Sequence, residues 1–138
     1  MLPEAATAAV RDALTALERD VRVHLELGPA ATPVTLLAAG GGELDPGAIT
    51  RGVVEAVCDL SERVALTVTE HTRPGPWPRT TIGPGLTYLG MPAGYELTTL
   101  VHGIVEAGRE ATLLSAASQE QLATLERDVS LAVYVTPT

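Results

Sequence analysis

Apolar residues recur at two spacings along the chain, and these separate predicted helices from predicted strands. From Pro3 they recur every three or four residues, which predicts an amphipathic helix ending near Arg19 or Asp20. From Val21 to Leu27 (VRVHLEL) apolar and polar residues alternate, which is typical of a strand with one covered face. The chain therefore begins with a helix and a strand.

The middle of the chain continues this alternation. Asp45 and Pro46 suit the N-cap and first position of a helix that ends near Glu62. Residues 63–70 (RVALTVTE) predict a further strand. Residues 33–39 (PVTLLAA) fit either a strand or a distorted helical turn, and the glycine run that follows would end both.

A proline-rich loop separates this part from a predicted hairpin. Residues 71–78 (HTRPGPWP) contain three prolines and predict an irregular loop. The strands RTTIG and LTYLG lie on either side of Pro84 and Gly85, and a further amphipathic helix ends at Gly108. The order of elements predicts an α/β or α+β fold in which helices flank a small mixed sheet.

The C-terminal part does not fit the same unit. Residues 115–128 predict another amphipathic helix, and residues 129–135 (VSLAVYV) are almost continuously apolar, as in a strand buried on both faces of a parallel sheet. The junction ERDVSLAVYV repeats the earlier junction ERDVRVHLEL. We therefore expect one unit over residues 1–110 and the beginning of a second copy over residues 111–138.

Composition narrows the functional classes. The net charge is -8, and no basic stripe is available to bind phosphates, so neither nucleic acid nor a membrane is expected as a partner. No apolar run approaches the roughly 20 residues that cross a bilayer. The N-terminus lacks a basic region ahead of an apolar segment, so we expect no secretory signal and a cytoplasmic location.

Few side chains suggest a catalytic, redox or metal-binding role. Cys58 is the only cysteine, which excludes an internal disulfide and a cysteine-based zinc site. A helical wheel places it near Arg51 and away from the apolar stripe, which predicts partial access to solvent. A reactive thiol and an inert packing residue both remain open, the second being commoner at mid-helix. No metal site is expected, because His24, His71 and His102 have no ligand spacing.

Three segments resemble a known family: WPRTTI (77–82), YLGMPAGYEL (88–97) and ERDVSLAVYVTPT (126–138). With the order of elements, they resemble the N-terminal thioredoxin-fold unit of the glutaredoxin-like protein disulfide oxidoreductases, which contain two such units in tandem. More distantly, the chain resembles the N-terminal domain of the flavoprotein component of alkyl hydroperoxide reductase. The resemblance covers nearly all of the chain and implies a thioredoxin-like fold with a cis-proline at Pro78.

The resemblance also locates the redox chemistry of the family. There, a strand ending in Val-Thr-Pro-Thr leads into a Cys-X-X-Cys pair at a helix N-terminus, where the helix dipole lowers a thiol's pKa. In this chain, such a pair would follow Thr138. We expect either that the sequence belongs to a longer protein that contains the pair, or that it is a naturally shorter protein that has lost it. The corresponding segment of the first unit, Gly28–Pro33, has no cysteine, so it cannot exchange disulfides. We expect no catalytic residue and no cofactor.

The fold that the resemblance implies makes one strand unusual. It requires the VRVHLEL strand to be central, yet Arg22, His24 and Glu26 share its outer face. Either a helix covers this face incompletely, or charge pairing compensates for burial.

These observations lead to two main hypotheses. In the first, the chain is a redox-inactive thioredoxin-fold unit related to the oxidoreductases of redox homeostasis. It acts as a scaffold or docking domain for a protein partner or a catalytic thioredoxin-like unit, with Pro78 structural or peptide-docking, and is no enzyme by itself. In the second, it is a free-standing interaction module that forms a homodimer or larger homo-oligomer through its C-terminal helix and strand. A redox sensor based on Cys58 is a third reading.

Overall fold

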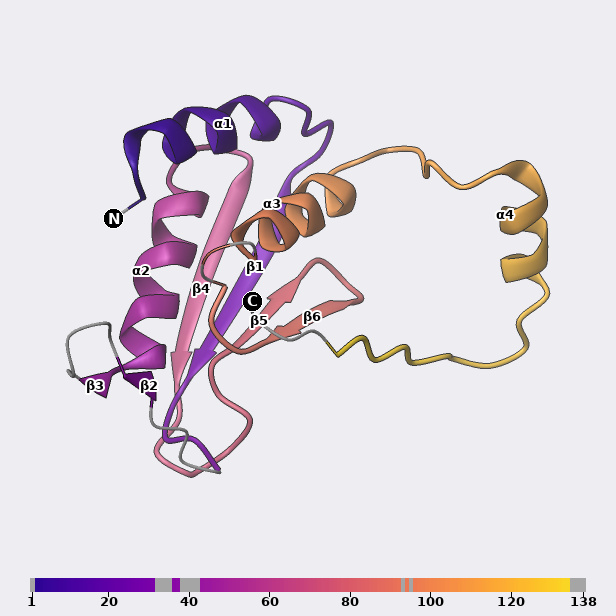
Figure 1. Cartoon of the computed structure of the whole chain (residues 1–138). Coiled ribbons are helices and arrows are strands. Elements are labelled where there is room, and N and C mark those ends of the chain that lie inside the picture. The colour runs from indigo at the N-terminus through magenta and orange to yellow at the C-terminus, as the bar shows by residue number, and fades with distance from the viewer. Residues whose placement is uncertain (1, 32–35, 38–42, 93, 95, 135–138) are drawn as a thin grey trace.

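Four strands form one mixed sheet in the order β4-β1-β5-β6 (Figure 1). In this computed structural model, residues 2–31, 36–37, 43–92, 94 and 96–134 are described. β1 runs parallel to β4 and antiparallel to β5, and β5 is antiparallel to β6. The strands are β1 (Val21–Leu27), β4 (Val64–Glu70), β5 (Arg79–Ile82) and β6 (Leu86–Leu89), with a separate pair made of β2 (Leu36–Leu37) and β3 (Glu43–Leu44).

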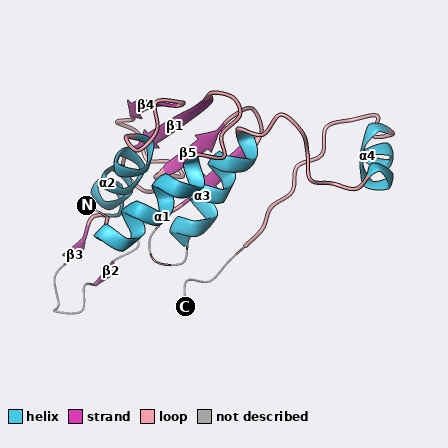
Figure 2. Ribbon diagram, turned by 90° about the horizontal axis from the view of Figure 1, so that it is seen from above, coloured by secondary structure: helices cyan, strands magenta, loops and turns pink. Residues whose placement is uncertain are grey.

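Three helices lie on one face of this sheet (Figure 2). They are α1 (Glu4–Leu14), α2 (Pro46–Cys58) and α3 (Glu96–Ala107). Asp45 caps α2 as the sequence predicts, because its carboxylate accepts hydrogen bonds from the backbone N–H groups of Gly47 and Ala48. The apolar stripes of the helices pack on the inward positions of β1 to form the core, which includes Val10, Leu14, Val23, Leu25, Val54, Val57, Ile82, Leu100 and Ile104.

The first helix is shorter than its apolar pattern predicts. α1 ends at Leu14, and the backbone N–H groups of Glu18 and Arg19 both donate to the carbonyl oxygen of Gly108 at the end of α3. Leu17 is still buried, although it lies beyond the helix. The apolar spacing therefore continues past the helix, because the following turn also packs against the core.

The second helix also ends early, at Cys58 rather than near Glu62. The backbone N–H groups of Leu60 and Ser61 donate to carbonyl oxygens three residues earlier, which tightens the chain into a turn before β4. Of the ambiguous segment 33–39, only Leu36 and Leu37 are described, and they form β2; the remaining residues lie outside the described part of the chain.

The C-terminal helix forms but is shorter than predicted, and the strand predicted over 129–135 does not form over its described residues, 129–134. α4 spans Ala116–Ala123 instead of 115–128, none of its residues is buried, and residues 129–134 form no strand. Leu131, Val133 and Tyr134 are 89%, 86% and 95% exposed. An amphipathic helix and a strand both need a neighbouring surface, and α4 lies away from the sheet (Figure 1).

The sheet has a second face, opposite the three helices (Figure 2). The strand registers place polar side chains on it. Residues paired across neighbouring strands share a face, so the register places Arg22, His24 and Glu26 on this side. Arg79 and Thr81 of β5 lie on the same side, because they pair with Glu26 and His24. This polar face contains the candidate site.

Candidate functional site

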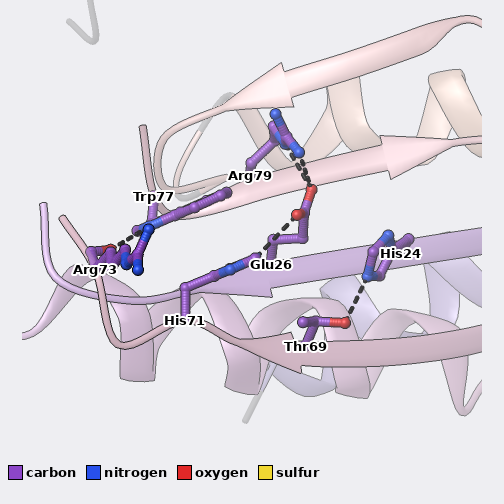
Figure 3. A network of polar contacts seen from close by, with 7 residues as sticks. All are labelled: His24, Glu26, Thr69, His71, Arg73, Trp77 and Arg79. Carbon is purple, nitrogen blue, oxygen red and sulfur yellow. Dashed lines mark hydrogen bonds and ion pairs between the residues drawn. The ribbon is translucent and has the colours of Figure 1, made fainter. Parts of the chain in front are cut away.

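A buried carboxylate lies at the carboxyl end of β1 on the polar face (Figure 3). Glu26 Oε2 accepts a hydrogen bond from Arg79 Nε at 2.6 Å, and Arg79 Nη2 lies 2.5 Å from the same oxygen. Glu26 Oε1 lies 3.0 Å from Nε2 of His71, which directly follows β4. Charge pairing therefore compensates for the burial of Glu26, whereas Arg22 on the same face is exposed, so each of the two alternatives that the sequence left open holds for part of this face.

The surroundings of Glu26 favour its ionised form. Burial by itself would raise the pKa of this carboxyl group, but the hydrogen bonds from Arg79 and His71 and the charge of Arg79 lower it. The pKa consequently lies below its ordinary value. At neutral pH the group is a carboxylate, and the network is an ion pair rather than a neutral hydrogen-bonded cluster.

The indole ring of Trp77 packs against this network. It stacks on the His71 ring, with centroids 4.0 Å apart and planes 1° apart, and the guanidinium carbon of Arg79 lies 5.2 Å from the indole centroid. Trp77 Nε1 donates to the carbonyl oxygen of Arg73 at 3.1 Å. The loop between β4 and β5 is thus joined to β1 and β5 through one aromatic and ionic cluster: Glu26, His71, Trp77 and Arg79.

Two glycines allow the indole to approach the backbone this closely. A Cβ atom on Gly28 would lie 2.7 Å from Trp77 Cδ1, and one on Gly75 would lie 2.6 Å from Cε2 of the same ring. Real Cβ atoms do not approach other atoms so closely, so a side chain at either position would displace the ring.

The segment that would hold a redox pair takes part in this packing. Among its described residues, Gly28–Ala31, the backbone N–H of Ala31 donates to Gly75 O at 2.9 Å, and Gly75 N–H donates to Pro29 O at 3.0 Å. Within these described residues, Ala30 forms a parallel bridge to Gly75 of the loop. Pro78 follows a cis peptide bond, is buried, and accepts a hydrogen bond from the backbone N–H of Gly90.

Cys58 lies far from this site along the sheet. It ends α2, just before the start of β4, whereas the cluster is at the end of β4 (Figure 1). The residue is 3% exposed, in contrast to the partial access that the helical wheel predicts, because its side chain packs within the hydrophobic core between the helices and the sheet. Burial, with a smaller effect of the Asp59 charge, raises the pKa of its thiol to about 12.

The other two histidines make no comparable cluster. His24 Nε2 lies 2.8 Å from Thr69 Oγ1, and His102 is exposed on α3. Over residues 2–31, 36–37, 43–92, 94 and 96–134, no three His, Cys, Asp or Glu side chains lie together as metal ligands would. In the same ranges, no helix is both long enough and apolar enough to span a membrane.

Sequence reasoning missed the roles of Trp77 and Arg79. A signal was present in Glu26, a charged residue on a strand expected to be central, since such a residue requires a partner. Its partner could not be identified, because the register of β1 and β5 is not a local property of the sequence.

Solved structures share this fold, while no protein-family model and no curated protein matches the chain. The alkylhydroperoxide reductase protein AhpF from Enterococcus faecalis, as a C503A mutant, gives a TM-score of 0.69 at 16% identity, covering 90% of this chain and 61% of that one. The NTD_N/C domain of the same protein gives 0.70 at 15%, covering 92% and 62%. A protein disulfide oxidoreductase from Aeropyrum pernix gives 0.71 at 19%, covering 91% and 56%.

These similarities concern the fold. Identities of 15% to 19% establish a shared architecture and no shared activity. The chain has a thioredoxin-like fold with a four-stranded mixed sheet, as the sequence resemblance predicted, and the neighbours are of the two kinds that it named. The chain spans about three fifths of the length of these structures.

Proposed function

We propose that this chain is a redox-inactive thioredoxin-like unit, related to the thiol-disulfide oxidoreductases of redox homeostasis, that serves as a scaffold or docking domain. Its partner would be a protein, and in particular a catalytic thioredoxin-like unit. The observation that carries the proposal is the site at Gly28–Ala31, which contains no sulfur and is bridged to the loop before Pro78.

The aromatic and ionic cluster supports a structural role for this end of the sheet. Glu26, His71, Trp77 and Arg79 join β1, β5 and the loop between β4 and β5 through contacts within the chain. A catalytic thiol needs an exposed, low-pKa position, whereas Cys58 is buried and its pKa is raised. The length of the structural neighbours, which extend beyond the part this chain matches, supports a partner unit.

An insulin-reduction assay with dithiothreitol tests this function. We expect the chain to give no rate above dithiothreitol alone, because exchange needs an accessible thiolate. A Cys58→Ser variant is the matched control, since it removes the single sulfhydryl. A rate above background would overturn the proposal, and its loss in Cys58→Ser would identify Cys58 as the cause. Because a lone buried cysteine suits a reducing compartment, we propose a cytoplasmic location as well.

A second candidate function is self-association through the C-terminal region. It is favoured by the apolar side chains exposed beyond α3, which include Leu113, Leu122, Leu125, Val129, Leu131, Val133 and Tyr134. Contiguous exposed apolar surface of this kind marks interaction sites. Sedimentation velocity over a concentration series distinguishes the candidates, because only this one requires a concentration-dependent oligomer of the chain alone.

A further inference from the structure

The exposed segment Val129–Tyr134 has the sequence of a strand but no strand beside it among the described residues. We propose that this segment adds, as a parallel strand, to the free edge of β4 in a second copy of the chain. The proposal rests on the second candidate function and names the surface that it would use.

The free edge of β4 is open to such pairing. β4 stands at one end of the sheet order, so among the described strands it pairs with β1 alone. From Val64 to Thr69 it contains no charge and no proline, and charged residues occur only at its ends, Arg63 and Glu70. Natural edge strands usually carry charges or prolines that prevent pairing. This edge lacks both over most of its length.

The repeated junction supplies the direction of pairing. In the parallel pairing of β1 with β4, Asp20 Oδ1 lies 3.6 Å from Arg63 Nη1, and Val21 N–H donates to Arg63 O at 2.8 Å. The sequence ERDV that forms this junction occurs again at 126–129. A parallel strand on the other edge of β4, in the same register as β1, would bring Asp128 near Arg63. An antiparallel strand would bring it near Glu70, where like charges repel.

The apolar positions match as well. Leu66 and Val68 of β4 point toward the helix side of the sheet and are only partly buried, at the margin of the core. An added strand places alternate side chains on that same side. Leu131 and Val133, which are two residues apart and exposed, would then extend the core past β4 and lose their contact with water.

The opposite edge of the sheet fits less well. β6 has 4 residues, whereas β4 has 7, and glycines at 85 and 90 bound β6 on both sides. The C-terminal segment lies on the β6 side of its own molecule, while β4 forms the far edge (Figure 1). A symmetric dimer overcomes this distance. Two copies related by a two-fold axis would each place their C-terminal segment on β4 of the other copy, and the assembly would close as a dimer.

Sedimentation velocity over a concentration series tests the segment. We expect a monomer–dimer equilibrium for the unaltered chain, and at least a ~100-fold weaker dimer for the double variant Leu131→Asp, Val133→Asp, because two carboxylates would be buried. Both residues are exposed in the single chain, so its fold should persist, as circular dichroism would verify. Leu113→Asp, also exposed but outside the segment, should leave the dimer unchanged.

Further variants identify the edge. Thr67→Lys on β4 should weaken the dimer ~10-fold, whereas Leu89→Lys on β6 should not. Asp128→Arg should also weaken it, and adding Arg63→Glu to that variant should restore it. A monomer at every concentration would overturn self-association and this inference together. A dimer that tolerates the Leu131→Asp, Val133→Asp variant, or one weakened by Leu89→Lys and not by Thr67→Lys, would overturn this inference alone.

Discussion

Glu26 is the residue in which sequence and fold conflict most. A charged residue on the central strand of a sheet costs free energy unless charge and hydrogen bonds compensate for its burial. Arg79 and His71 provide both. The conflict was visible in the sequence, but its resolution required a partner 53 residues away along the chain, which local patterns do not specify.

Replacing Arg79 should therefore destabilise the chain strongly. Arg79→Met leaves the Glu26 carboxylate buried without its main partner, which we expect to cost about 2–3 kcal/mol in the free energy of unfolding. Arg51→Met is the matched control, because Arg51 forms an ion pair with Glu70: both arginines are 36% exposed, but Glu70 is 72% exposed where Glu26 is 9% exposed. The control should lose less than about 1 kcal/mol. Equal losses in urea denaturation would contradict this account.

The lowered pKa of Glu26 predicts a pH dependence with a definite sign. A carboxyl group with a depressed pKa in the folded state contributes stability that is present above its unfolded pKa of about 4.3 and is lost as pH falls through the folded pKa. The stability difference between the unaltered chain and Glu26→Gln should shrink as pH falls below about 4. Urea unfolding at a series of pH values measures it, and a difference that grows toward acid would contradict the assignment.

At the scale of elements, the periodicities identified α1, β1, α2, β4, β5, β6 and α3 in their correct order, because helices and strands within the core have a locally encoded apolar face. The ends of α1 and α2 were misjudged, since Leu17 and Leu60 pack from turns. The C-terminal strand was predicted from an apolar sequence alone, and an apolar sequence does not form a strand without a neighbour. The contact of Trp77 with Gly28 joins segments distant in sequence and was not predictable.

The space around Gly75 and Gly52 predicts opposite effects of replacing these glycines by alanine. Gly75→Ala should destabilise the chain by about 1–3 kcal/mol, because its Cβ would overlap the indole ring. Gly52→Ala, inside α2 and with no atom of the described residues within 4 Å of the new Cβ, should instead stabilise it by about 0.5–1 kcal/mol. Thermal unfolding followed by the fluorescence of Trp77, the only tryptophan, reports both. Similar effects of the two substitutions would argue against close packing at the indole.

At the scale of the whole molecule, the sheet has two different faces. One is covered by α1, α2 and α3, and the other carries the polar network (Figures 2 and 3). The single thiol is buried on the covered side, and the segment that would hold a redox pair is joined to a loop by backbone hydrogen bonds. The fold thus retains a thioredoxin-like architecture while its described residues present no exposed thiol.

Alkylation of Cys58 in the folded chain tests this central claim most directly. At pH 8, a thiol with a pKa of about 12 has a thiolate fraction more than ~1,000-fold below that of an ordinary cysteine. We predict that iodoacetamide labels the folded chain at least ~100-fold more slowly than the same chain in denaturant. Labelling at similar rates in the two states would mean an accessible thiolate and would contradict a redox-inactive unit.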